Sequence, residues 1–261
     1  FCEILQQQKI KISLLSTGLT IKKNAASLIR YVNDIIVSLD GDEKLHDSIR
    51  NIPGAFNKLK EGVQAAKQIN PAYKITGRTV IHRLNFRNWI SIINSAQEMG
   101  LNQISFLPAD VSSHAFNRAA SWELPKQHEI LLAKEELPEL QQIIRQIIRD
   151  YSSCFETRFI AEPPETLQKI YTYYAAFYQL NPFPYKRCNA PWVSTVIEAD
   201  GKVRPCFFHD VMGNIRETPL TDILNNAKSI DFRKSLDMGT NSTCVKCVCS
   251  LNLPPRMNPV A

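Results

Sequence analysis

Short apolar runs alternate with longer amphipathic segments through the first 110 residues. The apolar runs have the length of strands and are bounded by turn residues such as Thr17-Gly18 and Asn70-Pro71. Between them, apolar residues recur at helical spacing, as at Leu59, Val63 and Ala66. The expected strands are 10–15, 34–39, 74–82 and 103–107, and the expected helices are 23–32, 56–69 and 89–99, with 40–53 as a loop. This alternation is typical of βα units and predicts an α/β fold with four parallel strands.

The pattern changes in the second half of the chain. Residues 109–130 carry few periodic signals and read as a long surface excursion. The stretch Asn181-Pro182-Phe183-Pro184 indicates a domain boundary. The further expected elements are helices at 134–151 and 164–180, a strand at 192–199, a two-residue type I′ turn at Asp200-Gly201, an antiparallel strand at 202–206 and short helices at 220–225 and 230–236.

Composition and charge narrow the class of protein. The 261 residues are 44% hydrophobic and 21% charged, which is ordinary for a globular protein with a sizeable core. No apolar run approaches the roughly 18 to 20 residues of a membrane span, and Phe1 to Leu5 do not resemble a signal peptide. We therefore expect a soluble cytoplasmic chain with no membrane partner. The net charge of +6 is interspersed, which argues against a nucleic-acid partner.

Seven cysteines are the main chemical feature of the sequence. Cys2 and Cys154 stand alone, whereas the other five crowd the last quarter of the chain. Cys188 and Cys206 bracket the expected hairpin, which brings distant positions together, and Cys244 and Cys247 have the Cys-x-x-Cys spacing that turns two sulfurs toward one metal. The expected metal ligands are Cys188, Cys206, Cys244 and Cys247.

Three interpretations of the clustered cysteines compete. Structural zinc is chemically adequate, but a zinc ribbon ordinarily uses two Cys-x-x-Cys knuckles, and the first pair here is far more widely spaced. Unligated buried cysteine is the second interpretation. An iron-sulfur cluster is favoured because a cluster is larger than one ion and tolerates irregular spacing. Cys249 is then a spare thiol or an alternative ligand, and we expect it to face away from the site.

The cysteine pattern resembles that of a known enzyme family. Cys188-x12-Gly201-x4-Cys206 followed by Cys-x-x-Cys looks like the auxiliary-cluster domain of radical S-adenosylmethionine enzymes, in the one-cluster form called twitch rather than the full SPASM form. In the first half, the segments that resemble this family are Ser38-Leu39-Asp40-Gly41, His46-Asp47, Ile49-Arg50 and Gly54-Ala55-Phe56, with Thr17-Gly18, Asn85 and Leu107-Pro108 at matching places.

One defining motif of the family is missing. The Cys-x-x-x-Cys-x-x-Cys loop, which holds the cluster that cleaves S-adenosylmethionine, does not occur, nor does the Gly-Gly-Glu-Pro segment that follows it. The chain also opens with Phe1 rather than Met. The resemblance therefore implies an N-terminally truncated chain, and we expect this fragment to be inactive.

The resemblance implies a fold and an activity. The fold is a partial parallel (β/α) barrel over 1–110, a helical continuation over 111–185 and a SPASM/twitch-like domain of a β-hairpin plus helices over 186–261. The intact enzyme would generate a 5′-deoxyadenosyl radical for hydrogen abstraction in peptide or protein modification. The alternatives are a small-molecule dehydrogenase, or a non-catalytic iron-sulfur or zinc relic if the truncation is natural. The implied cofactors are an auxiliary 4Fe-4S cluster, S-adenosylmethionine and a second 4Fe-4S cluster.

The resemblance also implies site residues and partners. Ser38 and Asp40 would bind the ribose hydroxyls or amino group of S-adenosylmethionine, and Arg50 its methionyl carboxylate. The other implied cofactor-binding residues are Thr17, Asn85 and Leu107. Each has a plainer interpretation as a turn, a surface arginine or a helix N-cap. The expected partners are a peptide or small-molecule substrate and an electron donor such as flavodoxin or ferredoxin. No catalytic residue is assigned.

Overall fold

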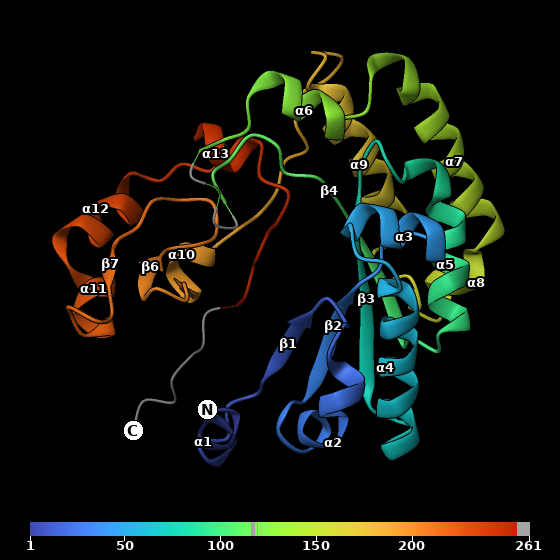
Figure 1. Ribbon diagram of the computed structural model, residues 1–261. Helices are drawn as coiled ribbons and strands as arrows, with labels where there is room; N and C mark the ends of the chain where they lie inside the picture. The colour runs from blue at the N-terminus through green and yellow to red at the C-terminus, as the bar shows by residue number, and fades with distance from the viewer. Residues whose placement is uncertain (116–117, 119, 255–261) are drawn as a thin grey trace. The chain divides into compact units, whose positions relative to one another are not determined.

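The computed structural model describes residues 1–115, 118 and 120–254 (Figure 1). The chain divides into two compact units. The first contains residues 1–109 and 130–180, and the second contains residues 110–129 and those from 181 onward. The second unit thus includes residues 110–129, which the sequence analysis grouped with the helical continuation of the barrel.

A four-stranded parallel sheet forms the centre of the first unit. Its strands are β1 (Ser13–Ser16), β2 (Asp34–Ser38), β3 (Lys74–Ile81) and β4 (Gln103–Pro108), in the order β1-β2-β3-β4. All three pairings are parallel, which confirms the predicted four parallel strands. β1 begins later than expected because the amide of Ile12 is bound by the Asn33 side chain instead of a neighbouring strand.

Residues 159–161 extend this sheet beyond β4. Ile160 forms a parallel bridge with Ile104, whose amide donates to the carbonyl of Phe159 at 2.7 Å. The carbonyl of Ile104 accepts from Ala161 at 2.8 Å. The sequence pattern does not predict this extension, because two apolar residues are too few to indicate a strand.

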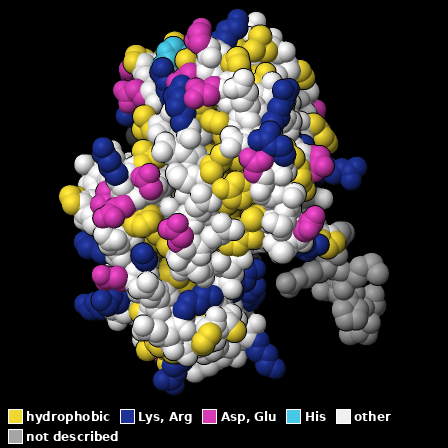
Figure 2. Space-filling model, turned by 90° about the vertical axis from the view of Figure 1, so that its right-hand side faces the viewer, with side chains coloured by type: hydrophobic (Ala, Val, Ile, Leu, Met, Phe, Trp, Pro, Cys, Tyr) yellow, Lys and Arg dark blue, Asp and Glu magenta, His cyan; other side chains and the backbone are white. Residues whose placement is uncertain are grey.

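The predicted long helices of the first unit are present. They are α2 (Ile21–Tyr31), α4 (Ala55–Ile69), α5 (Trp89–Glu98), α7 (Leu137–Asp150) and α9 (Pro164–Ala176). α4 and α5 lie on the same side of β3 (Figure 1), and the core on that side contains fully buried residues such as Leu59, Ile75 and Trp89. Figure 2 shows acidic and basic side chains intermingled on the outer side of this unit, as the interspersed charge predicts.

Several short elements were not predicted. They are α3 (Glu43–Arg50), η1 (Phe86–Asn88) and α8 (Ser152–Glu156) in the first unit and α6 (Leu124–Ile130), most of which lies in the second. The first unit also begins with α1 (Cys2–Gln7), and η2 (Lys134–Glu136) opens the helix expected at 134–151. α3 lies where we expected a loop. The Asp42 side chain accepts from the amide of Leu45 at its start, and Asn51 ends it with φ +52°. Its eight mostly polar residues give too short a pattern to predict a helix from apolar spacing.

The second unit contains a small antiparallel sheet with short helices. The strands are β5 (Val196–Ile197), β6 (Lys202–Arg204) and β7 (Gly213–Asn214), and the remaining helices are α10 (Ala190–Val193), α11 (Leu220–Asn225), α12 (Ala227–Ser235) and α13 (Ser242–Val245). Its buried cluster consists of Val203, Met212 and Ile223. The strand predicted at 192–199 is wrong over its first residues, because Pro191 lies in the first turn of α10.

The turn between β5 and β6 differs from the predicted type I′ turn. Only Gly201 has a positive φ, +88°, whereas a type I′ turn needs two such residues. The amide of Gly201 donates to the carbonyl of Glu198 at 2.9 Å, and the amide of Glu198 donates to the carbonyl of Lys202 at 2.8 Å. The loop therefore has three residues. A Cβ at Gly201 would also lie 2.5 Å from the Asn214 side chain, so glycine is required sterically as well.

Among the described residues, no helix combines the length and apolar composition that crossing a bilayer requires.

The two faces of the sheet can be distinguished by a pair of neighbouring substitutions. Ile35 is 1% exposed on the helix-covered face, whereas Ile36 points to the opposite face and is only partly buried. We expect Ile35→Ala to lower the free energy of unfolding by about 2–5 kcal/mol, because it leaves a core cavity. Ile36→Ala should lower it by less than half as much in the same urea titration. Equal losses would contradict this assignment of the faces.

Candidate functional site

The five clustered cysteines line one cavity in the second unit. They are Cys188, Cys206, Cys244, Cys247 and Cys249. The cavity has a volume of about 200 Å³. That is more than ten times the roughly 10–15 Å³ that one water molecule needs by the same measure. Two cysteine pairs that are far apart in sequence therefore share one enclosed space with room for more than a single ion.

Local hydrogen bonds fix the segments that carry these cysteines. The Asn241 side chain accepts from the amides of Thr243 and Cys244, both at 3.1 Å, and so caps α13. The amide of Cys247 then donates to the carbonyl of Cys244 at 3.2 Å, which closes the Cys-x-x-Cys turn. Next to Cys188, the amide of Asn189 donates to the carbonyl of Leu251 at 2.7 Å and ties that segment to the end of the described chain.

The thiols of the cavity are hard to ionise by themselves. Burial raises the pKa of Cys206, and it raises the pKa of Cys244 to about 11 and that of Cys247 to about 12. Proximity to the other thiols adds to the effect, since Cys206 and Cys188 both raise the pKa of Cys244. Four thiolates in this space need a positively charged group to offset their repulsion. A metal or an iron-sulfur cluster supplies that charge and displaces the protons.

The metal hypotheses differ in how closely the ligands must meet. Within the described part of the chain, no three His, Cys, Asp or Glu side chains are close enough to hold one metal ion together. A structural zinc ion needs all its ligands at about 2.0–2.3 Å. An iron-sulfur cluster distributes its cysteine ligands around several iron atoms. The four cysteines line one cavity that has room for more than a single ion.

The remaining cysteines lie in different surroundings. Cys249 is exposed but still lines the cavity, and its amide donates to the sulfur of Cys247 at 3.4 Å. The structure therefore does not separate Cys249 from the site, contrary to our expectation that it faces away. Cys2 and Cys154 are in the first unit. Cys154 is buried there, and its sulfur accepts a hydrogen bond from the Gln97 side chain at 3.4 Å.

His209 also belongs to this site. It is 8% exposed, and its Nε2 atom lies 3.3 Å from the sulfur of Cys244. From the sequence alone, its place close to Cys206 is compatible with a contact to the cluster environment, and a surface position is the simpler interpretation. Burial lowers the pKa of His209, so the ring is neutral near pH 7.

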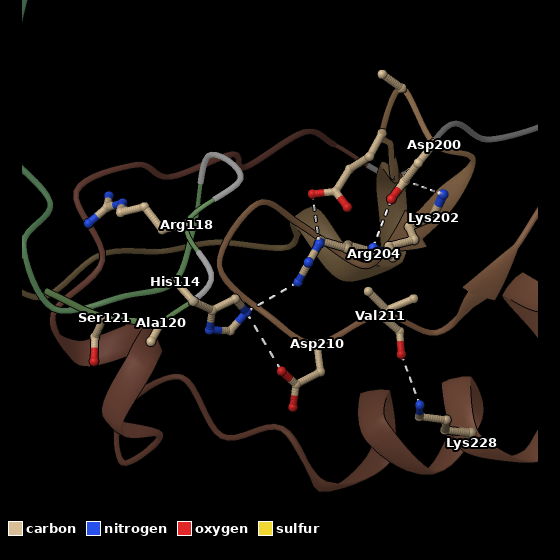
Figure 3. Close-up of a pocket in the computed structure, with 12 residues that line it drawn as sticks. His114, Arg118, Ala120, Ser121, Asp200, Lys202, Arg204, Asp210, Val211 and Lys228 are labelled. Carbon is tan, nitrogen blue, oxygen red and sulfur yellow. Dashed lines mark hydrogen bonds and ion pairs between the residues drawn. The ribbon is translucent and has the colours of Figure 1, made fainter.

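A larger open pocket lies in the same unit, beside the β5–β6 hairpin (Figure 3). Its volume is about 1040 Å³. Figure 3 shows Arg204 at its centre, with one terminal nitrogen 3.2 Å from His114 and Nε 2.9 Å from Glu198. The same guanidinium donates to the carbonyl of His209 at 3.0 Å. The pocket is therefore connected to the cysteine cavity through one arginine and one histidine.

In the first unit, Asp40 is the centre of a buried polar network at the end of β2. It is 4% exposed, and Arg50 binds it with both Nε, at 2.6 Å, and a terminal nitrogen, at 3.0 Å. The Nδ1 atom of His46 lies 3.2 Å from its carboxylate. Burial alone would raise the pKa of Asp40, but His46 and Arg50 outweigh it and hold that pKa below its usual value. Asp40 is therefore ionised near neutral pH.

Asn85 joins this network from the end of β3. Its Nδ2 atom donates to the carbonyls of Asp40 at 3.2 Å and Val80 at 3.0 Å, and its Oδ1 atom accepts from the amide of His82 at 2.9 Å. Asn85 precedes η1, but its side chain makes no capping hydrogen bond there. The fully buried amide instead fixes the backbone at the ends of two neighbouring strands.

The other residues assigned by resemblance lie at the same strand ends. Ser38 is the last residue of β2 and is in register with Arg78 of β3. Thr17 follows β1 and is exposed, and Leu107 is partly buried near the end of β4. The structure thus joins Asp40, Arg50 and Asn85 directly, and it places the other three at the carboxyl ends of their strands.

Glu162 is a second residue that sequence reasoning missed. Its carboxylate accepts from the amide of Phe106 at 3.0 Å and lies near Ser105 and Arg78. Burial raises the pKa of Glu162 to about 7, although Phe106, Arg78 and Ser105 oppose the rise. A carboxyl group with this pKa can hold or release a proton near neutrality. No periodic signal marked it, because only the bridge at Ile160 brings residue 162 beside β4.

Comparison with known proteins places the cysteine cavity in a known domain. Residues 188–248 match the SPASM family, described as an iron-sulfur cluster-binding domain. This match covers the four predicted ligands and the histidine beside them. It does not reach the parallel sheet, for which the evidence comes from whole-chain similarity.

Two curated relatives are similar over most of the chain. An AdoMet-dependent heme synthase of Methanosarcina barkeri is 27% identical over 239 residues, 86% of this chain and 61% of that protein. A cysteine-type anaerobic sulfatase-maturating enzyme of Clostridium novyi is 25% identical over 247 residues, 90% of this chain and 59% of that protein. The chain therefore spans about three fifths of the length of these relatives.

Solved structures share the fold. Streptococcus suis SuiB, bound to its precursor peptide SuiA, matches with a TM-score of 0.57 at 16% identity, over 94% of this chain and 54% of SuiB. Native anSMEcpe with bound AdoMet and a peptide matches with a TM-score of 0.56 at 15% identity, over 92% of this chain and 66% of anSMEcpe. The predicted resemblance to SPASM-containing radical S-adenosylmethionine enzymes, and the predicted partial-barrel α/β fold, are confirmed.

The unusual pKa of Glu162 predicts a specific pH dependence of stability. Between pH 4.5 and about 7 the folded chain keeps a proton on Glu162 that the unfolded chain has released. The free energy of unfolding should therefore fall as pH rises through this window, by an amount on the order of 3 kcal/mol from this group. Glu162→Gln should remove that part of the slope in urea titrations at successive pH values. Glu165→Gln, at an exposed position on α9, is the control and should keep the wild-type dependence on pH. An unchanged slope in Glu162→Gln would refute the assignment.

Proposed function

We propose that this chain is part of a radical S-adenosylmethionine enzyme that abstracts hydrogen from a peptide or protein substrate. The observation that carries the proposal is the convergence of Cys188 and Cys206 with Cys244 and Cys247 on one cavity, inside a region that matches an iron-sulfur cluster-binding family. The parallel sheet, with its ionised carboxylate at the strand ends, supports the same class of enzyme.

The four cysteines are the proposed ligands of an auxiliary 4Fe-4S cluster. The donor set fits, because thiolates are the usual ligands of such clusters and the cavity holds more than one ion. When bound, the cluster supplies a one-electron redox centre. The chain's own contribution is to hold the sulfurs through the α13 cap and the Asn189 contact.

The strand ends of the first unit are the proposed S-adenosylmethionine site. Asp40 presents a carboxylate kept ionised by Arg50 and His46, which suits the amino group or ribose hydroxyls. Arg50 uses Nε and one terminal nitrogen on Asp40, which leaves the second terminal nitrogen for the methionyl carboxylate. The remaining residues proposed to border the site are Thr17, Ser38, Asn85 and Leu107.

The substrate class rests on the structural neighbours. Both SuiB and anSMEcpe are bound to peptides, which supports a peptide substrate here. The AdoMet-dependent heme synthase supports the second candidate, a small-molecule substrate, because its sequence identity is slightly the higher of the two relatives. In either case we expect the electron donor to be a flavodoxin or ferredoxin. We also expect the chain of 261 residues to be inactive by itself.

The activity is tested on the gene product that contains this sequence. With S-adenosylmethionine and a reductant under anaerobic conditions, it should release 5′-deoxyadenosine. A deuterated peptide encoded beside the gene should transfer deuterium to that product. Transfer only from a deuterated tetrapyrrole would favour the small-molecule candidate. A gene product that binds clusters but never cleaves S-adenosylmethionine would refute the enzymatic proposal.

The cluster proposal predicts the metal content of the chain itself. Anaerobic reconstitution should give about four irons and about four sulfides per chain, with broad absorbance near roughly 400 nm. Single alanine variants of Cys188, Cys206, Cys244 and Cys247 should each lose most of both. Cys154→Ala, in the other unit, is the matched control and should bind as much iron as the wild type. One tightly bound zinc without sulfide would instead establish a structural-zinc site.

A further inference from the structure

His209 contacts both cysteine pairs of the cavity. Its ring Nε2 atom is 3.3 Å from the sulfur of Cys244, which belongs to the second pair. Its backbone N–H, together with that of Phe208, acts on the thiol of Cys206, which belongs to the first pair, and opposes the rise of its pKa. One residue therefore acts on two sulfurs that come from segments far apart in the sequence, and its ring is within hydrogen-bond distance of one of them.

The position of His209 is fixed from several sides. The edge of its ring packs against Phe232 of α12, with 4.9 Å between ring centroids and an interplanar angle of 63°. Its carbonyl accepts from Arg204 at 3.0 Å, and Arg204 is held in turn by Glu198 at 2.9 Å. The side chain is also buried, at 8% exposed. The imidazole is thus held in place before any group binds, so little entropy is lost in keeping the contact to Cys244.

Ligation of Cys244 would determine the direction of this hydrogen bond. A free thiol can donate its own proton to the ring, but a cysteine sulfur bound to iron has no proton and can only accept. The proton must then be on Nε2 of His209, since that is the ring atom that faces the sulfur. Nε2–H to thiolate is a charge-assisted hydrogen bond, of the kind that is roughly twice as strong as a neutral one.

We propose that His209 is a positioning residue that donates from Nε2 to the Cys244 sulfur and raises the reduction potential of the auxiliary cluster. The inference rests on the proposed cluster function. A hydrogen bond to a ligating sulfur withdraws negative charge from it, and the reduced cluster carries one more negative charge than the oxidised one. The bond is therefore stronger in the reduced state and favours reduction.

The chain of 261 residues is suited to a test, because it lacks the Cys-x-x-x-Cys-x-x-Cys motif and its reconstituted cluster would titrate alone. In an EPR-monitored redox titration, His209→Phe should lower the ratio of reduced to oxidised cluster by threefold to tenfold at a fixed potential; tenfold corresponds to a 59 mV shift for one electron. His209→Gln keeps an N–H donor and should restore most of the wild-type potential. The control is His114→Ala, since His114 contacts Arg204 and not a cysteine.

A second measurement uses only the wild-type chain, so it does not depend on a variant that folds. With ¹⁵N-labelled histidine, pulsed EPR of the reduced cluster should detect one weakly coupled imidazole nitrogen. A strong coupling, which indicates direct ligation to iron, or no coupling would overturn the inference. So would an unchanged potential in His209→Phe at wild-type iron content. A wild-type chain that binds no iron and sulfide would overturn the proposed cluster function as well, so the two failures are distinguishable.

Discussion

Parallel pairing in register is the constraint on which the strand-end site depends. Because β1 to β4 all run in the same direction, their carboxyl ends meet at one edge of the sheet. Asp40 and Asn85, which are 45 residues apart, can then share a hydrogen bond, and α3 can bring Arg50 back onto the same carboxylate. A one-residue slip of β2 would turn its buried side chains to the opposite face and carry the chain at Asp40 away from these partners.

The second unit is held together by a different balance. Its buried hydrophobic cluster is small, with Val203, Met212 and Ile223 at its centre, and a small core contributes little stability by itself. Its cavity also contains thiols that burial and mutual proximity keep protonated. A bound cationic group would offset the repulsion between ionised thiolates in this cavity. It would also cross-link two segments that are distant in the sequence. The close approach of several buried thiols thus makes thiolates unfavourable without a metal. It also couples cluster binding to the stability of this unit.

The sequence was informative where a pattern is local and failed where a contact is tertiary. Apolar runs located all four strands, and cysteine spacing indicated residues that the structure gathers around one cavity. The short polar helix α3 was missed because its stability comes from caps and ion pairs rather than from an apolar face. Glu162 was missed for a related reason, since it acquires its chemistry from residues more than 30 positions away.

The strand-end network also differs from an ordinary apolar core. His46 is completely buried, yet its Nε2 atom has no hydrogen-bond partner among the described residues, a state that costs about 1–3 kcal/mol. Its other ring nitrogen is already engaged with Asp40. A core selected only for stability would replace this histidine by an apolar side chain. Its retention beside an ionised Asp40 and a preorganised Arg50 is explained if the network serves to hold a polar ligand at the strand ends.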